Sequence, residues 1–328
     1  MGVLPLLLAL VLALAVGLYV VLDGFDLGIG ILFLLAPSEE DRDAMMNAVG
    51  PVWDGNETWL VMGGTVLFAA FPAAYATLLP RLYLPLMAML FGLIFRGVAF
   101  EFRFRASRFK RTWDWSFALG SALASFMQGL MLGLFINGFT DGEGTPAPIL
   151  ETFAIVSGLG VVAFYTQLGA AWLILKTEGS TLAFARRALP WALAITCLFI
   201  VIISIFTPLT HPSIVLRWFS LPNFFYLSPV PLLTALLAFG IWRANSHRRE
   251  SLPYLLSVAL FGMAYLGLGI SLWPYAVPQT LTIWQAASSR PTLIAVGIGV
   301  AVVLPIILAY LAYSHWVFRG KTPAGYEH

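Results

Sequence analysis

The chain has 328 residues, of which 60% are hydrophobic and only 10% are charged, and its mean hydropathy is +0.87. Soluble domains carry about a quarter charged residues, so this composition excludes a soluble globular protein and indicates a membrane protein. The net charge of +2 gives no sign of a nucleic-acid partner, and the single cysteine, Cys197, excludes a disulfide framework and a Cys-x-x-Cys metal or redox pair.

Nine apolar segments are each long enough to cross a bilayer, which takes about 20 mostly apolar residues. The first segment predicts a retained helix rather than a secretory signal, because no Lys or Arg precedes Arg42. Only Pro80 and Arg81 separate the second and third segments, which predicts a tight helical hairpin at that point. The predicted spans are 3–33, 57–78, 81–101, 115–136, 150–174, 188–207, 224–242, 254–273 and 292–314.

The loops between these spans differ in their content of Lys and Arg. Of the 18 basic residues, 15 fall in or beside loops one, three, five and seven and the C-terminal tail. Cytoplasmic loops carry the excess of positive charge in membrane proteins. We therefore expect the N-terminus outside and the C-terminus in the cytoplasm. Loop three is the most basic, with Arg103, Arg105, Arg108, Lys110 and Arg111.

The predicted fold class is an all-α polytopic membrane protein that forms a single transmembrane domain over residues 1–328. We expect two four-helix groups, as pseudo-repeat halves 1–140 and 148–275, and one peripheral final helix at 292–314. No sequence repeat is visible, so the halves rest on the helix count alone. The Gly- and Pro-rich segment 137–148 has no Lys or Arg and suits a connector between them.

Polar residues interrupt the apolar segments in three clusters, all near the predicted cytoplasmic side. A charge at membrane depth costs at least about 2.5–3.5 kcal/mol on insertion scales, so each one needs an explanation. In the first cluster Asp23 and Asp26 share a helix face, and the spacing of Gly24 and Gly28 allows another helix to come close. Asp26 is a candidate functional carboxylate, and the alternative is a pair of interfacial acids beside a packing groove.

The second cluster leads into the second span and places Asp54, Asn56 and Glu57 between two tryptophans, Trp53 and Trp59. Asp54 as the N-cap with Glu57 three residues later would make a capping-box-like pair at the start of a helix. A cap needs neither the tryptophans nor Asn56. The spacing therefore leaves capping and function equally open.

The third cluster closes the third span, where Glu101 and Arg105 have the spacing of a surface ion pair. Arg96 lies deeper, inside the apolar run, and on an ideal helix it is about 140° from Glu101. We therefore expect Arg96 to find its counter-charge on another helix, at Asp26 or Asp54.

Acidic groups gathered on the cytoplasmic side suit proton uptake, because carboxyl groups held away from water can exchange protons near neutral pH. The same residues would suit a proton-coupled secondary transporter, and a purely structural scaffold is a third reading. Haem in a membrane bundle needs axial His, Met or Cys ligands, and no histidine is expected at mid-membrane. We expect no metal or cofactor site in this chain; its histidines are His211, His247, His315 and His328.

The three clusters, in this order, resemble subunit II of the cytochrome bd ubiquinol/menaquinol oxidases. The most specific match is Pro-Val-Trp-Asp-Gly-Asn-Glu-Thr-Trp at 51–59, together with Asp-Gly-Phe-Asp-Leu-Gly-Ile-Gly at 23–30 and Phe-Arg-Gly-Val-Ala-Phe-Glu-Phe-Arg at 95–103. Trp-Asp-Trp at 113–115 and the segment 281–289 also match, so the likeness spans essentially the whole chain.

The resemblance implies a haem-free subunit of a quinol:oxygen oxidoreductase of the aerobic respiratory chain in the bacterial plasma (inner) membrane. It places haems b558, b595 and d in a partner, the haem-bearing subunit I, with room for small accessory subunits and a structural quinone. It also implies a proton pathway that includes Asp54 and Glu101, with Asp26 and Arg96 beside them. Position 101 is commonly an aspartate in the family. Trp53 and Trp59 would wall the path or lie on an oxygen access route.

Overall fold

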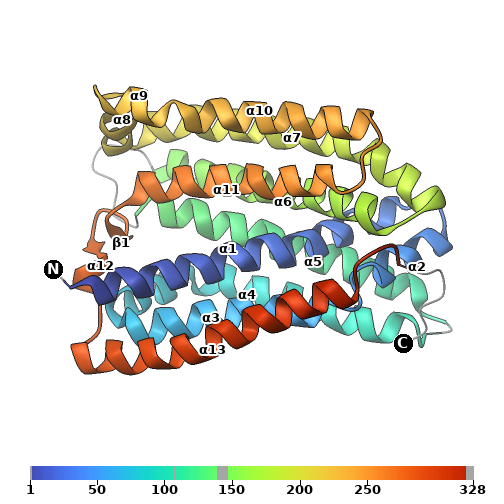
Figure 1. The fold of residues 1–328 in the computed structure, drawn as a ribbon, viewed down its shortest axis with the longest axis horizontal. Coiled ribbons are helices and arrows are strands. Elements are labelled where there is room, and N and C mark those ends of the chain that lie inside the picture. The colour runs from blue at the N-terminus through green and yellow to red at the C-terminus, as the bar shows by residue number, and fades with distance from the viewer. Residues whose placement is uncertain (1, 107, 139–146, 323–328) are drawn as a thin grey trace.

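Long, nearly parallel helices make up almost all of residues 2–106, 108–138 and 147–322, which are the residues that the computed structural model describes (Figure 1). A helix bonds every backbone group within its own segment, which is what an apolar run needs where there is no water. The long helices of this part are α1 (Val3–Leu32), α3 (Trp53–Ala70), α4 (Pro72–Arg103), α5 (Lys110–Ile136), α6 (Ala147–Lys176), α7 (Gly179–Thr210), α10 (Pro229–Ser246), α11 (Leu252–Leu272) and α13 (Arg290–Val317).

Short elements join the long helices at both ends of the bundle. A two-stranded antiparallel sheet, β1 with β2, lies at the end where α1 begins (Figure 1). The helix α2 lies at the opposite end. The short elements are η1 (Phe33–Leu35), α2 (Glu39–Asn47), α8 (Pro212–Phe219), α9 (Asn223–Leu227), β1 (Tyr275–Val277), β2 (Leu281–Thr282) and α12 (Ile283–Ala286).

The all-α polytopic fold expected from the sequence is confirmed. Within the described residues, eight helices are long and apolar enough to cross a membrane. The remaining long helix, α3, has 18 residues and carries Asp54, Asn56 and Glu57 in its first turns, which lowers its hydropathy. The count of nine spans and the orientation of the termini stay predictions, although α1 begins and α13 ends at opposite ends of the bundle (Figure 1).

The predicted hairpin at Pro80 and Arg81 is wrong. The chain turns instead at Phe71, between α3 and α4, and Pro80 and Pro85 lie inside the continuous helix α4. Phe71 precedes Pro72, and the residue before a proline is disfavoured in helical conformation, so the break falls there. The carbonyl of Ala70 next to this turn accepts a hydrogen bond from the backbone N–H of Ser288 at 2.9 Å.

Helix α1 is the centre of the bundle, because it contacts α3, α5, α6 and α13. The helices α3, α4 and α13 lie on one side of α1, and α6, α7, α10 and α11 lie on the other (Figure 1). The packing of α1 and α5 against α6 joins the two predicted groups into one body. Their description as pseudo-repeat halves stays a prediction, and residues 139–146 of the proposed connector lie outside the described residues.

The Gly24–Gly28 spacing does bring a second helix close, as its pattern predicted. A Cβ atom at Gly28 would lie 1.7 Å from the carbonyl oxygen of Tyr165 on α6. A Cβ at Gly169, on the facing side, would lie 2.4 Å from the carbonyl carbon of Gly28. The two backbones are therefore in direct contact, and only glycine fits at this crossing.

A network of charged residues closes the end of the bundle where α1 finishes, which we call the basic end because the loops at this end hold most of the Lys and Arg residues. Arg103 is fully buried and bonds Asp114 at 2.5 Å and also Asp43 on α2, while its guanidinium lies over the ring of Phe33. Asp41 on α2 accepts hydrogen bonds from Ser180 and Thr181 on α7, at 2.6 and 2.7 Å. Through α2, the network ties both helix groups together.

Substitution of Gly28 by alanine is expected to prevent the close packing of α1 on α6. The added methyl group would meet backbone, which cannot rotate away, so the destabilisation should reach about 3 kcal/mol or more, the upper end for overpacking. The measurement is the thermal midpoint of the purified protein. Gly262→Ala, at an exposed α11 position where a Cβ meets nothing within 4 Å, is the matched control and should leave the midpoint unchanged.

Asp41 is expected to contribute to stability at neutral pH and to lose that contribution in acid. Burial by itself would raise the pKa of this carboxyl, but hydrogen bonds from Ser180, Thr181 and Ser38 outweigh it and lower the pKa below its ordinary value of 3.8. The contribution of Asp41 to stability is therefore complete above pH 3.8, and it is lost as the pH falls through the lower pKa of the folded state. Acid-unfolding curves of the wild type and Asp41→Asn should therefore converge at low pH and differ at pH 7.

Candidate functional site

A buried group of charged residues lies toward the basic end, where α1, α3 and α4 meet. The guanidinium of Arg96 on α4 contacts Asp23 on α1, with 2.9 Å between Nη1 and Oδ1. It also contacts Glu57 on α3, with 2.5 Å between Nη2 and Oε1. The side chains of Arg96 and Asp23 are 2% and 1% exposed, whereas Glu57 is 31% exposed. The group thus reaches from the interior to the surface of the chain through Glu57.

Asp26 lies one turn beyond Asp23 and is held by Asn56. The Nδ2 atom of Asn56 donates to Asp26 Oδ2 at 2.8 Å and to the carbonyl of Leu22 at 3.2 Å. Both side chains are fully buried. Asn56 thereby fixes the start of α3 to α1 and orients one oxygen of Asp26, while Asp26 Oδ1 has no hydrogen-bond partner among the described residues.

Two expectations about these side chains need correction. Arg96 does find its counter-charges on other helices, but they are Asp23 and Glu57 rather than Asp26 or Asp54. The N-cap of α3 is Val52, which makes no side-chain cap bond, so Asp54 lies within the first turn and Glu57 bonds Arg96 instead of closing a capping box. Helix spacing placed Asp23 and Asp26 on one face of α1, but the offset between helices decides which acid reaches Arg96.

The remaining predicted residues lie on α3 and α4, the helices that supply Glu57 and Arg96. Asp54 and Glu101 are both exposed in this chain, and within the described residues no ion pair joins Glu101 to Arg105. Trp53 packs on Phe100 with ring centroids 5.2 Å apart, which places its ring against α4. Trp59 is 1% exposed, and its indole N–H has no partner among the described residues.

Polar side chains between α1, α5 and α6 continue from this group and were not singled out from the sequence. Tyr165 donates to Gln128 Oε1 at 2.6 Å, and Gln128 Nε2 donates to Tyr19 at 2.9 Å. Tyr19 lies one turn before Asp23 on α1. A glutamine in the middle of an apolar run was the sequence signal that could have identified Gln128, because a lone amide at that depth needs a partner.

A cavity of about 270 Å³ adjoins the group, between the start of α3 and the last turns of α13. Buried Asn56 and Trp59 line its inner part, and the exposed residues Thr58, Ile306 and Tyr310 line its outer part. The cavity therefore leads from the surface of the chain to the side chain that holds Asp26. Its other lining residues are Pro51, Val52, Gly55, Ile307, Leu311, Ser314 and His315.

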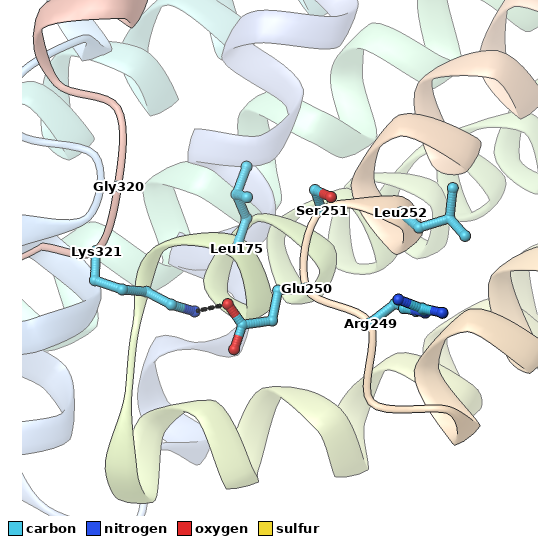
Figure 2. A pocket seen from close by; sticks show the side chains of 7 residues that line it. All are labelled: Leu175, Arg249, Glu250, Ser251, Leu252, Gly320 and Lys321. Atoms are coloured by element: carbon cyan, nitrogen blue, oxygen red, sulfur yellow. Dashed lines mark ion pairs between the residues drawn. The ribbon is translucent and has the colours of Figure 1, made fainter.

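A larger pocket of about 660 Å³ lies at the basic end, between the start of α11 and the segment that follows α13 (Figure 2). Lys321 pairs there with Glu250 at 3.0 Å and donates to the carbonyls of Ile174 and Thr177 at the end of α6. These contacts cap α6 and fasten the returning chain to it. The smaller cavity, not this pocket, adjoins the buried acids.

The histidines lie at helix ends. His211 is the C-cap residue of α7 and contacts Thr210, His247 follows α10, and His315 is in the last turn of α13. His328 lies outside the described residues. Among the described residues there is no group of three or more His, Cys, Asp or Glu side chains arranged to hold a metal ion.

Comparison with known proteins identifies the family of this all-helical membrane bundle. The family model described as cytochrome bd terminal oxidase subunit II matches residues 4–318, nearly the whole chain. The chain belongs to this family. Curated relatives of cytochrome bd subunit II include the cytochrome bd-I ubiquinol oxidase subunit 2 of Escherichia coli K12, which is 27% identical over 92% of this chain and 91% of its own length. Cytochrome bd ubiquinol oxidase subunit 2 of Bacillus subtilis is 29% identical over 95% of this chain and 94% of its own length.

A solved structure agrees with the fold of this cytochrome bd subunit II. A chain of the bd oxidase from Geobacillus thermodenitrificans superposes with a TM-score of 0.82 at 16% identity, covering 97% of this chain and 99% of that one. Family membership makes this chain a subunit of a terminal oxidase, an oxidoreductase complex, and a multi-pass protein of the bacterial inner membrane. It does not favour the secondary transporter that the acidic residues alone left open.

Loss of the Arg96 guanidinium is expected to destabilise this cytochrome bd subunit II strongly. Removing one partner of a buried ion pair costs about 3–5 kcal/mol, because the remaining charge is left uncompensated. Arg96→Gln should lower the thermal midpoint of the purified oxidase, and Asp23→Asn added to it should restore part of the loss. Arg187→Gln, at an exposed position of α7, serves as the control. A double variant no more stable than Arg96→Gln would show that the pair contributes nothing.

Proposed function

We propose that this chain is the haem-free subunit II of a bd-type quinol:oxygen oxidoreductase of the aerobic respiratory chain. It supports a haem-bearing subunit I, in which haems b558, b595 and d receive electrons from quinol and reduce oxygen. Its own contribution is a proton pathway from the cytoplasm. The observation that carries this proposal is the buried group of Asp23, Asp26, Glu57 and Arg96, with Asn56 holding Asp26.

The composition of that group favours proton exchange. The group holds three carboxyl groups and one guanidinium, which contacts Asp23 and Glu57 while Asp26 is bonded by Asn56, so the group is electrically neutral only when it also binds protons. Uncompensated charge is costly at membrane depth, and the group is mostly buried. Reduction of oxygen to water consumes protons, and a site that takes up and releases them beside the catalytic subunit meets that need.

The route would start at the basic end, for which the distribution of Lys and Arg predicts a cytoplasmic location. Asp54 and Glu101 are exposed there and would collect protons, and the half-exposed Glu57 would pass them inward. Arg96 would set the charge balance, and Asp26 and Asp23 would be the inner acids, with Asp23 one turn deeper on α1. Trp53 and Trp59 would wall the route, and the indole of Trp59 could also line a path for oxygen.

The partners follow from the same proposal. Subunit I, membrane lipids and quinol are the expected partners, together with small accessory subunits. A structural quinone in this subunit is compatible with the proposal, but no residue of the chain is assigned to it.

Replacement of Asp26 or Asp54 by asparagine tests the proton role. Each substitution removes an exchangeable proton site at nearly constant volume, and proton relays contribute about 10²–10⁴-fold to rate, so oxidase turnover should fall by at least about tenfold. The haem content of the purified complex should stay at the wild-type level. Turnover is measured as oxygen consumption with quinol.

Glu151→Gln is the control, because it removes an exposed carboxylate at the start of α6, far from the basic end. Wild-type turnover in both aspartate variants would refute the proton pathway. Loss of haem together with turnover would show that the acids hold the complex together instead.

A further inference from the structure

The charged residues of the basic end are distributed unequally between the two groups of helices. Beside α2 and the nearby ends of α3, α4 and α5, residues 37–54 and 101–114 hold six Lys or Arg and seven Asp or Glu. Beside α6, α7, α10, α11 and the segment after α13, residues 174–187, 241–252 and 316–322 hold eight Lys or Arg and only two Glu. This second side has a large positive excess, and we call its cations the basic patch: Lys176, Arg186, Arg187, Arg243, Arg248, Arg249, Arg319 and Lys321.

The cations of the two sides also differ in their partners. Three cations of the first side pair with carboxylates of α2 and α5. In the basic patch, by contrast, Arg186 donates to the backbone carbonyls of Arg248 and Arg249, at 2.9 and 3.4 Å. Within the described residues, Lys321 with Glu250 is the one ion pair that the patch makes. Carbonyl groups satisfy N–H donors but carry no net charge, so the basic patch is complementary to an anion.

The pocket of about 660 Å³ opens within the basic patch, beside the start of α11 (Figure 2). Its volume lies in the range of about 300–1,000 Å³ that is usual for ligand sites. Arg249 and Lys321 line it together with the hydroxyl-bearing Ser251. The side chain of Arg249 is exposed and makes no hydrogen bond or ion pair with any described residue, so its guanidinium is available to a phosphate group.

Apolar side chains adjoin the same pocket. Leu252 lines it, and Leu255 follows three residues later on the same face of α11; these side chains are 42% and 59% exposed. At the end of α13, Trp316 is 60% exposed and lies 4.5 Å from the guanidinium of Arg319, as is typical of an aromatic residue at a membrane interface. Cations beside exposed leucines match a phospholipid, in which phosphate and acyl chains are joined, whereas free phosphate would use the cations alone.

We propose that this pocket binds the headgroup of an anionic phospholipid, with Arg249 bonding the phosphate and the acyl chains lying along Leu252 and Leu255. The other cations of the basic patch attract the headgroup, as basic pockets between membrane helices do on the cytoplasmic side. Lys321 in the same pocket holds the segment after α13 on α6, so a bound lipid stabilises that junction. The site does not rest on the proposed proton pathway and would stand if that pathway were refuted.

Lipid binding is tested on the intact oxidase, purified in detergent and titrated with phosphatidylglycerol, phosphatidylcholine or inorganic phosphate. Native mass spectrometry counts the bound lipid, and the thermal midpoint reports the stabilisation. Phosphatidylglycerol should bind and raise the midpoint at concentrations at which the other two have no effect. Equal binding of the two lipids would overturn recognition of an anionic headgroup, and an equal effect of inorganic phosphate would overturn recognition of a lipid.

Arg249→Glu tests the location of the site. It reverses an exposed charge whose side chain bonds no other described residue, so the fold is kept, and the apparent affinity for phosphatidylglycerol should fall about tenfold or more. Arg108→Glu makes the same change at an exposed position of the same end, among the balanced charges of the first side, and should keep the wild-type affinity. Equal affinities of the two variants would show that the lipid does not bind at this pocket.

A density map of the intact oxidase gives a second, independent measurement. Headgroup density beside the guanidinium of Arg249, with acyl chains along Leu252 and Leu255, is the expected result. Side chains of the partner subunit filling the pocket would overturn the proposal.

Discussion

The ion pairs of Arg96 are the interaction on which the arrangement of α1, α3 and α4 depends. A guanidinium that is 2% exposed within an apolar helix is tolerable only if opposite charges meet it, and they come from two other helices. Satisfying one cation therefore fixes three helices relative to one another. Because Asn56 binds Asp26 in the same place, the polar and charged residues that are most costly to bury specify how the core of this membrane bundle packs.

Apolar packing cannot provide this specificity by itself. In lipid, helices gain little from burying leucine against leucine, so close contact and polar pairing decide which faces meet. The chain uses both devices on α1. Gly28 brings α6 into backbone contact, while Asp23 and Asp26, five and two residues before it, bond α4 and α3. Helix α1 therefore holds its neighbours by both means, with glycine contact toward α6 and polar bonds toward α3 and α4.

Much of this architecture was predictable from the sequence. Apolar runs predicted the long helices, the Gly24–Gly28 spacing predicted a close neighbour, and the position of Arg96 within its run predicted partners on other helices. The hairpin prediction at Pro80 and Arg81 is wrong because a membrane helix accommodates Pro80, as it does Pro85, and the break falls at Phe71. The choice of Asp23 and Glu57 over Asp26 and Asp54 could not be predicted, because it depends on how far one helix is shifted along another.

The backbone contact between α1 and α6 has a consequence for motion. Two helices that touch through side chains can slide or rock, because rotamers adjust as the surfaces pass. At Gly28 and Gly169 there are no side chains to adjust, and a shift of one residue would drive a neighbouring side chain into the opposing main chain. This contact therefore holds α1 and α6 in one fixed relative position. Such a body is suited to hold fixed geometry beside a catalytic neighbour through every turnover, and unsuited to the alternating tilts by which carriers expose a site to each side of a membrane in turn.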